Sequence, residues 1–321
     1  MRMVASVPRF ASLAKIIFIS SCVTACCALL GMVYDSFAIF THFICYFLGY
    51  SAATAVLTFT TFFARRVWEP SKWRKGAVLV LFLQALVPLS LLLPNRSVEL
   101  NNPEKFSVTW MNLHFETAAV NELVQIIDKQ PSDIVVVAEA QASQLADAFS
   151  DYPFSKEVKS ASLHVYSKFP LSDVTAVIND NDRDFLVVEV RVKRRKFTLL
   201  AAHVGWPIYS EHAKTLANAA QWATRSENAI VMGDFNSTPW AAPFRRMLRD
   251  GDLRHSRQGH GLLNSWHIDR NKHFGLPIDH ITYRGQINNT NFELIETEHS
   301  DHSAIRGEYV LAGKLTRKPR D

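Results

Sequence analysis

Cysteine is scarce in this 321-residue chain and is missing from most of it. The four cysteines, Cys22, Cys26, Cys27 and Cys45, all lie in the apolar N-terminal third. The remaining two thirds therefore hold no disulfide and no thiolate metal site, which excludes zinc-finger and zinc-ribbon folds for that part. The sequence also has no internal repeat and no low-complexity tract.

Acidic residues are nearly missing from the N-terminal third. Residues 1–95 contain eight basic residues but only two acids, Asp35 and Glu69, whereas the rest of the chain has 27 basic and 28 acidic residues. The net charge of +5 therefore arises in the N-terminal third. A protein that binds duplex nucleic acid needs its excess positive charge on the folded domain, so the charge gives little support to such a partner.

Charged residues are absent from three long apolar runs, at 16–34, 36–64 and 76–94. A helix needs about 20 apolar residues to cross the hydrocarbon core of a bilayer, and each run reaches or nearly reaches that length. None shows the recurring polar face of a soluble helix, although Gln84 and Pro88 interrupt the third run. We therefore expect residues 1–94 to form three transmembrane helices, near 16–34, 38–63 and 76–94, with the lipid bilayer as their partner.

The basic residues around these runs indicate an orientation. Arg2, Arg9 and Lys15 precede the first run, and the loop at 65–75 between the second and third runs carries five more. Because basic loops stay in the cytoplasm, the chain is expected to be a multi-pass inner or plasma membrane protein, with everything after Pro94 on the extracytoplasmic side. Two alternatives remain open. The first run could be a cleaved signal peptide, or one run could fail to span, which would leave the rest inside.

A C-terminal domain is expected at 106–312, after a polar linker at 95–105 and before a basic tail at 313–321. Strand-like stretches outnumber helical ones, and hairpins mix with helical crossovers, which favours largely antiparallel sheets with helices outside. The basic turn at 193–196 joins two of the strands as a hairpin. Strands are predicted at 106–113, 133–138, 163–166, 174–178, 184–192, 197–203, 229–232, 280–283, 292–295 and 304–309, and helices at 117–129, 141–149, 212–225 and 239–248.

Polar residues stand at or just past the ends of these strands, where a scaffold displays catalytic groups. Carboxylates and carboxamides are hard oxygen ligands that suit Mg²⁺ or Mn²⁺. An Asp next to a His fixes the imidazole tautomer, and such a set suits metal-assisted hydrolysis of a phosphate ester. The residues are Asn112, Glu139, His203, Asp234 and Asn236 in Gly-Asp-Phe-Asn, Asp279 in Ile-Asp-His, and Asp301 and His302 in Ser-Asp-His. A long loop with four histidines, 252–274, is expected to rim the site.

The order of these residues, from Asn112 to His302, resembles the DNase I-like endonuclease/exonuclease/phosphatase superfamily. The resemblance implies an α+β fold, a four-layer sandwich of two mainly antiparallel sheets flanked by helices. It also implies that the chain is a membrane-anchored bacterial member that hydrolyses a phosphate ester. A phosphodiester is the expected ester. The expected substrate is a lipid headgroup, a nucleotide or a nucleic acid, and no specific protein partner is predicted.

Carried over to this sequence, the resemblance assigns a metal set. Asn112 and Glu139 would hold the catalytic Mg²⁺ or Mn²⁺, and Asp301 would orient His302 and touch the metal. His302 would contact the scissile phosphate or act as a base.

The resemblance assigns the remaining roles to a second group. Asp234 would activate the attacking water, Asn236 would hydrogen-bond the phosphoryl group and Asp279 would give a second acidic support. His203 would assist the leaving group, although the sequence identifies no acidic partner for it.

Departures from the family pattern narrow the activity. Abasic-site endonucleases follow the metal Glu with Thr-Lys, whereas Ala140-Gln141 stands here, which speaks against that activity. Ala138 replaces a Gln that is not a ligand. Two other functions stay open, a nuclease acting on DNA or RNA and a non-catalytic, membrane-anchored binding module that keeps the fold.

Overall fold

A computed structural model describes residues 7–63, 72–95, 97, 99–145, 147–172, 175–179 and 182–312. The predicted basic tail, and the basic loop as far as residue 71, lie outside these residues. The chain divides into two compact units. One comprises the residues up to Leu92 together with Trp240–Ala242, and the other comprises the residues from Leu93 onward apart from those three.

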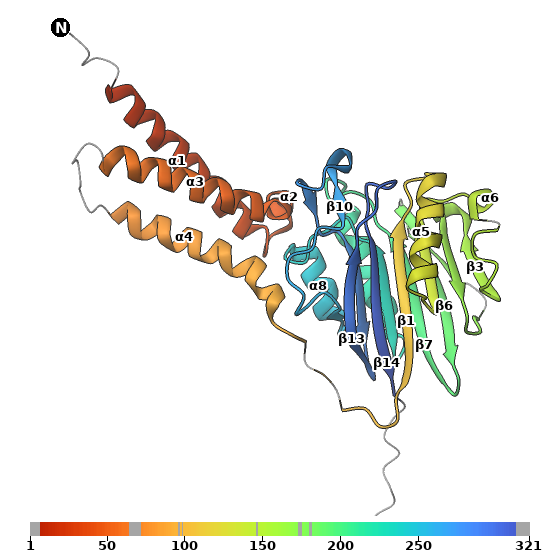
Figure 1. Ribbon diagram of the computed structural model, residues 1–321. Helices are drawn as coiled ribbons and strands as arrows, with labels where there is room; N and C mark the ends of the chain where they lie inside the picture. The colour runs from red at the N-terminus through yellow and green to blue at the C-terminus, as the bar shows by residue number, and fades with distance from the viewer. Residues whose placement is uncertain are drawn as a thin grey trace, which may run out of the picture. The chain divides into compact units, whose positions relative to one another are not determined.

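The N-terminal unit is helical (Figure 1). It contains α1 (Val7–Leu30), η1 (Asp35–Phe37), α2 (Ala38–His42), α3 (Ile44–Phe63), α4 (Lys72–Leu89) and η2 (Ser90–Leu92). The first predicted helix ends early, at Leu30, and the second is broken at Phe43. Over the described residues no single helix combines the length and apolar character that crossing a membrane requires, while Asp35–His42 and Ile44–Leu57, bent by 66°, meet that requirement as a pair. Three membrane spans therefore stay a prediction.

Two six-stranded sheets form the C-terminal unit. The first contains, in spatial order, β13 (Ile287–Ile295), β14 (Ala304–Leu311), β1 (Glu104–Asn112), β2 (Ile134–Ala138), β4 (Leu163–Ser167) and β3 (Phe154–Val158). The second contains β5 (Thr175–Asn179), β6 (Asp182–Val192), β7 (Arg195–His203), β8 (Ala229–Asp234), β12 (Asp279–Arg284) and β9 (Arg254–His255). Only the β1–β2 and β7–β8 pairs are parallel among these described strands. The expected antiparallel character is confirmed.

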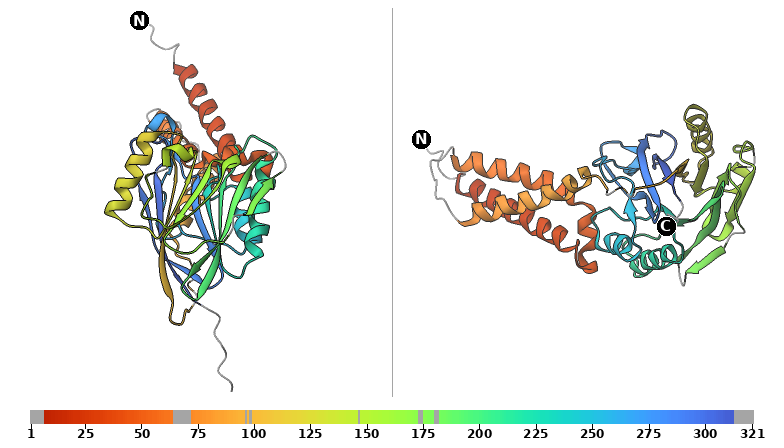
Figure 2. Two further views of the ribbon diagram at one scale, coloured as in Figure 1. Left: turned by 90° about the vertical axis from the view of Figure 1, so that its right-hand side faces the viewer. Right: turned by 90° about the horizontal axis from the view of Figure 1, so that it is seen from below.

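Helices cover the outer faces of both sheets, as Figure 2 shows. α5 (Thr117–Lys129) packs Val120 and Leu123 against the first sheet, whereas α7 (His212–Thr224) and α8 (Ala242–Asp250) pack on the second. The main core lies between the sheets. In β1, Val108 and Trp110 enter this core and Met111 faces α5, because successive strand residues point to opposite faces. The layers are those of the predicted sandwich.

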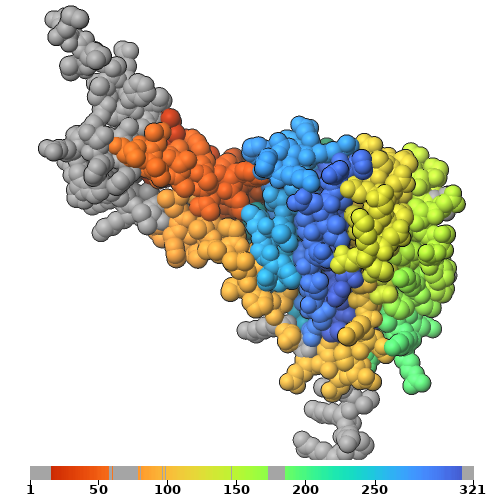
Figure 3. Space-filling model, viewed as in Figure 1, coloured from red at the N-terminus to blue at the C-terminus, as the bar shows by residue number. Residues whose placement is uncertain are grey.

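Several boundaries differ from the prediction. β1 begins at Glu104, inside the expected linker, and the edge strand β3 was not predicted at all. The helix expected at 141–149 is reduced to α6 (Ala142–Leu145). Residues 252–274 are not simply a loop, since they contain β9, β10 (Trp266–His267), which pairs with β11 (Gly275–Leu276), and η4 (Ile268–Arg270). The space-filling view shows the side of the molecule on which β13 and β14 (blue) lie beside α5 (yellow) (Figure 3).

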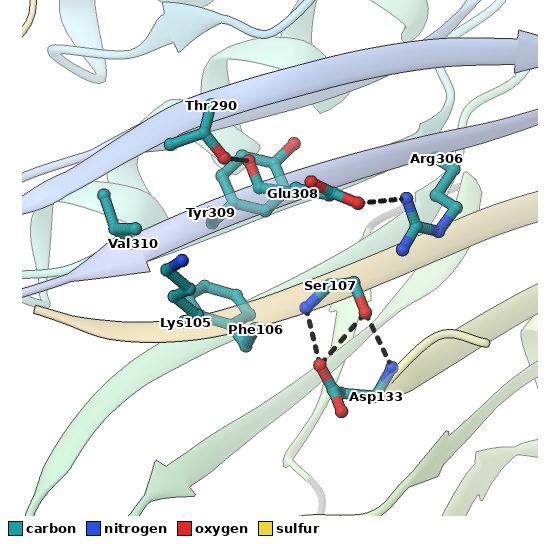
Figure 4. Close-up of a pocket in the computed structure, with 9 residues that line it drawn as sticks. All are labelled: Lys105, Phe106, Ser107, Asp133, Thr290, Arg306, Glu308, Tyr309 and Val310. Atoms are coloured by element: carbon teal, nitrogen blue, oxygen red, sulfur yellow. Dashed lines mark hydrogen bonds and ion pairs between the residues drawn. The ribbon is translucent and has the colours of Figure 1, made fainter. Parts of the chain in front are cut away.

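A cavity of about 330 Å³ lies at the start of β1, at the opposite end of this strand from Asn112 (Figure 4). Several of its polar groups pair with one another. Both the backbone N–H and the hydroxyl of Ser107 donate to the Asp133 carboxylate, at 2.8 and 3.0 Å, and the Arg306 guanidinium donates to Glu308 at 2.8 Å. These bonds join β1 to β2 and stabilise β14, so the cavity is structural and separate from the predicted catalytic residues.

Candidate active site

Strand register brings the predicted residues together at one end of the core between the sheets. In the second sheet His203 pairs with Asp234, and Asp234 pairs with Asp279. The three continue the core-facing alternation of Ala201, Met232 and Ile281, so their side chains point to the same face. In the first sheet Asn112 ends β1 in the same way, following Val108 and Trp110. A polar cluster therefore replaces the apolar core where these strands end.

Two of the predicted site residues have a left-handed backbone conformation. Glu139, which follows β2 directly, has φ +51°, and Asn236, which follows β8, has φ +46°. Left-handed backbone is uncommon for residues other than glycine and is concentrated at functional sites. Glycine is also required at position 233, because a Cβ there would overlap the carbonyl oxygen of Ala202 on the neighbouring strand. The sequence Gly-Asp-Phe-Asn is thus required by local geometry as well as by chemistry.

Asp279 and His302 form a buried pair that joins the two sheets. The Asp279 Oδ2 lies 2.8 Å from the His302 Nδ1, and the other carboxylate oxygen accepts a 2.9 Å hydrogen bond from the Trp110 indole N–H. Burial would lower the pKa of His302, but Asp279, with further help from Asp234 and Asp301, raises it to about 10. Asp279 thus favours the protonated imidazole, whose Nε2 lies 3.7 Å from the Asp234 Oδ2.

Asp234 lies at the centre of the cluster and is buried. Its Oδ2 is 3.7 Å from the His302 Nε2 and 3.4 Å from the Asn112 Nδ2, while Oδ1 accepts a 2.9 Å bond from the Asn236 backbone N–H. Burial, followed by the nearby Asp279, raises the pKa of Asp234 to about 7. A carboxylate with such a pKa is suited to accept a proton near neutral pH.

Glu139 supplies the acidic partner that the sequence did not reveal for His203. The Glu139 Oε1 is 3.2 Å from the His203 Nε2, which also lies 3.7 Å from the Asp234 Oδ2. His203 is buried and Glu139 is partly open to solvent. The pair spans the two sheets, so the spacing within either strand gave no sign of it.

Asp301 reaches the cluster through His114. Its Oδ1 is 2.7 Å from the His114 Nδ1, its Oδ2 accepts a 2.9 Å bond from the Trp266 indole, and the His114 backbone N–H donates to the Asn112 Oδ1. Burial would raise the pKa of Asp301, but His302 and the bonds from His114 and Trp266 outweigh it and lower the pKa. The structure thus adds His114 and Trp266 to the predicted set. In the sequence, position was the only signal for these two residues. His114 lies two residues past Asn112, and Trp266 lies inside the histidine-rich segment 252–274.

The donor chemistry of the cluster fits a divalent cation. Asn112, Glu139 and Asp301 offer the oxygen atoms that Mg²⁺ or Mn²⁺ prefers. Burial first, and then the charges of Asp279 and Glu139, raise the pKa of Asp234, so a cation bound here would offset negative charge. Asp234, Asp279 and His302 also place ligand atoms within 4.8 Å of one another. Both oxygens of Asp279 and both oxygens of Asp301 already lie within hydrogen-bond distance of a protein nitrogen. The ligand roles of Asn112, Glu139 and Asp301 stay a prediction.

Replacing Trp110 with phenylalanine is expected to lower the free energy of unfolding by about 1–3 kcal/mol, because a buried carboxylate oxygen of Asp279 loses its donor. Urea unfolding monitored by circular dichroism measures the change. Trp206→Phe is the matched control, since that indole is exposed. Equal stability of the two variants would contradict the role given to the Trp110 hydrogen bond.

Two buried histidines lie directly behind the site. The His280 Nε2 is 2.7 Å from the Ser237 carbonyl oxygen and must donate to it, so the His280 Nδ1 accepts the 3.0 Å bond from the His255 Nε2. The His280 ring is therefore neutral. Burial lowers the pKa of both well below the usual 6.5, and the buried Arg257 cation lowers both further. His255, one of the four histidines in the segment 252–274, is thus a structural residue.

This pair predicts a loss of stability in acid. Since the folded pKa values lie below the unfolded value of 6.5, the unfolded chain binds more protons as the pH falls. The stabilisation is complete above pH 6.5 and is lost below it, by up to about 1.4 kcal/mol per pH unit for each ring. Urea unfolding from pH 7.5 to 5 measures the slope. His255→Gln should flatten it, and the exposed control His273→Asn should not; two equal slopes would contradict the interpretation.

Comparison with known proteins identifies the fold. Residues 110–302 match the model of the Endonuclease/Exonuclease/phosphatase family. A humanized TDP2 from D. rerio is 14% identical, with a TM-score of 0.54 over 64% of this chain and 98% of that one. A Bacteroides thetaiotaomicron protein of the family is 15% identical, with a TM-score of 0.55 over 69% and 100%.

A further solved structure contains nucleic acid. The 3′ phosphatase NExo from Neisseria, bound to a product DNA hairpin, is 15% identical, with a TM-score of 0.51 over 63% of this chain and 98% of that one. No curated protein matches the chain. Over the C-terminal domain the likeness to these solved structures is thus one of fold.

Proposed function

Because this chain belongs to the endonuclease/exonuclease/phosphatase family, a family of hydrolytic phosphoesterases, we propose that it hydrolyses a phosphodiester with the help of Mg²⁺ or Mn²⁺. The observation that carries the proposal is the convergence of Asp234 with His203, Asn112 and His302 at the ends of strands from both sheets. A non-catalytic binding module would not need this complete set.

Asp234 is the base that takes a proton from the attacking water. It is buried, and the backbone N–H of Asn236 fixes one of its oxygens, so the other is directed toward His302 and His203. The side chain of Asn236 donates to the Val204 carbonyl oxygen at 2.9 Å, which holds this turn beside the bound phosphoryl group. The position between two histidines suits proton transfer to and from substrate oxygens.

His302 binds a phosphoryl oxygen through its Nε2–H. Asp279 holds the opposite ring nitrogen and stabilises the imidazolium, as an aspartate does for a catalytic histidine elsewhere. Asn112, Glu139 and Asp301 hold the cation, which when bound supplies positive charge for the phosphoryl oxygens. His203, paired with Glu139, assists the departing alcohol by donating a proton.

The test is a substrate panel for the full-length protein in detergent with Mg²⁺ or Mn²⁺. It covers a soluble aryl phosphodiester, a phospholipid, a sugar phosphate, and single- and double-stranded DNA and RNA. Hydrolysis of at least one diester is expected. If none is hydrolysed by wild type above the level of His302→Ala, the proposal is wrong. The nuclease alternative gains support if nucleic acid is the preferred substrate.

In this proposal residues 1–94 anchor the chain in an inner or plasma membrane, with the C-terminal domain on the extracytoplasmic side. The three uncharged runs and the basic residues around them support this arrangement. Fusion of a reporter that is active only outside the cytoplasm, placed after Ala312, tests it. Activity of the reporter is expected, and activity of a cytoplasmic reporter at the same place would overturn it.

A further inference from the structure

Exposed large hydrophobic side chains of the C-terminal domain gather in three loops. Over the described residues from 106 to 312 there are seven, with 42–66% of each side chain exposed. Such side chains scattered singly need no explanation, but a gathered set marks a binding surface. We call them the apolar rim: Phe115 in the loop 113–116; Trp206, Ile208 and Tyr209 in the loop 204–211; and Leu262, Ile268 and Phe274 in the segment 259–276.

Each loop of the apolar rim is attached to a residue of the active site. The Phe115 backbone N–H donates to the Glu139 carbonyl oxygen at 2.7 Å. The carbonyl oxygen of Val204, two residues before Trp206, accepts a 2.9 Å hydrogen bond from the Asn236 side chain. The rim therefore borders the site on the sides of Glu139 and Asn236.

The third loop is attached to Asp301. The His267 backbone N–H donates to the Asp301 carbonyl oxygen at 2.9 Å, and the next residue, Ile268, donates to Phe274 at 3.0 Å. Figure 1 shows β10 and the start of α5, which carry two of these loops, at the same end of the sheets. The three loops that carry the apolar rim are thus anchored at the end of the sheets where the catalytic carboxylates lie.

The same segment carries basic side chains between its apolar ones. Arg270, Lys272 and His273 stand between Ile268 and Phe274, against one acid, Asp269. The Arg270 guanidinium is 3.0 Å from Glu116, and the Lys272 ammonium is 2.9 Å from Glu296, in pairs whose side chains are about half exposed. Exposed pairs of this kind contribute little to stability, so both cations are able to turn toward the phosphates of an anionic surface. Basic residues mixed with exposed Trp, Phe and Ile are typical of protein surfaces that lie at a lipid interface.

We propose that the apolar rim docks the active site on a bilayer surface and that the substrate is a phosphodiester in a phospholipid headgroup. This inference rests on the proposed function. Water adds to phosphorus, the P–O bond to one alcohol breaks, and the products are that alcohol and a phosphomonoester. Ile208, Leu262 and Ile268 have no ring on which a nucleic acid base could stack, and residues 96–321 carry no net positive charge to hold a duplex. A lipid surface uses the aliphatic and aromatic members of the rim alike.

The test compares one phospholipid in mixed micelles with a soluble aryl phosphodiester, using the full-length protein in the same detergent. Trp206→Ser/Ile208→Ser, and separately Ile268→Ser/Phe274→Ser, should lower kcat/KM for the phospholipid about tenfold or more. The soluble diester should be hydrolysed at the wild-type rate, which also reports that each variant is folded. Gln221→Ser, an exposed change on α7, is the control and should leave both rates unchanged.

The outcomes separate this inference from the proposed function. Hydrolysis of the soluble diester without hydrolysis of phospholipid overturns the inference alone, as does an equal loss on both substrates in the rim variants. A loss confined to single-stranded DNA overturns it in favour of a nucleic acid. Failure to hydrolyse any diester overturns both.

Discussion

Asp234→Asn is expected to lower kcat for phosphodiester hydrolysis by about 10²–10⁴-fold, the usual contribution of a general base. The carboxamide keeps the size of the side chain, and it can still accept the Asn236 N–H, but it cannot take a proton from water. KM should change little, because Asp234 is buried beneath the groups that would bind the phosphoryl oxygens. The measurement is initial rate against substrate concentration for the substrate that the panel identifies.

A matched control distinguishes chemistry from the removal of a charge. Asp252→Asn makes the same substitution at a carboxylate that is 82% exposed and lies at the end of the second sheet away from the site. It should keep the wild-type kcat. Unfolding of both variants in urea shows whether each is folded under the assay conditions. A folded Asp234→Asn protein with at least half of the wild-type kcat would remove Asp234 from the role of base.

The active site shows which features could be predicted from the sequence. Asn112, Asp234 and Asp279 each continue the two-residue alternation of a buried strand, so their position at a strand end and their core-facing direction follow from local pattern. The order of the motifs then indicated the fold that would bring them together. Register, which depends on that same alternation, then places His203, Asp234 and Asp279 side by side.

The contacts that were missed all join residues from different sheets or from loops. Glu139 meets His203, and Trp110 donates to Asp279, across the space between the sheets. No periodicity in either strand encodes such a pair. β3 was missed for a different reason: it is an edge strand with mostly half-buried residues, so it lacks the buried alternation on which a strand prediction depends.

Chelation of divalent metal is expected to abolish hydrolysis, and added Mg²⁺ or Mn²⁺ is expected to restore it. Four carboxylates, those of Glu139, Asp234, Asp279 and Asp301, converge around His302, whose pKa the three aspartates raise. An anionic phosphodiester entering this site is repelled unless further positive charge is present. The measurement is the rate after dialysis against EDTA, followed by titration with each metal.

Glu139→Gln then tests which residues hold the metal. The carboxamide removes one negative charge from the oxygen set, so the metal concentration that gives half-maximal rate should rise by about 10- to 100-fold, while the rate at saturating metal falls less. Glu189→Gln, a surface carboxylate of β6 that pairs with Lys196 at 2.6 Å, is the matched control and should leave the titration unchanged. Loss of rate without a shift in metal requirement would mean that Glu139 acts through His203 alone.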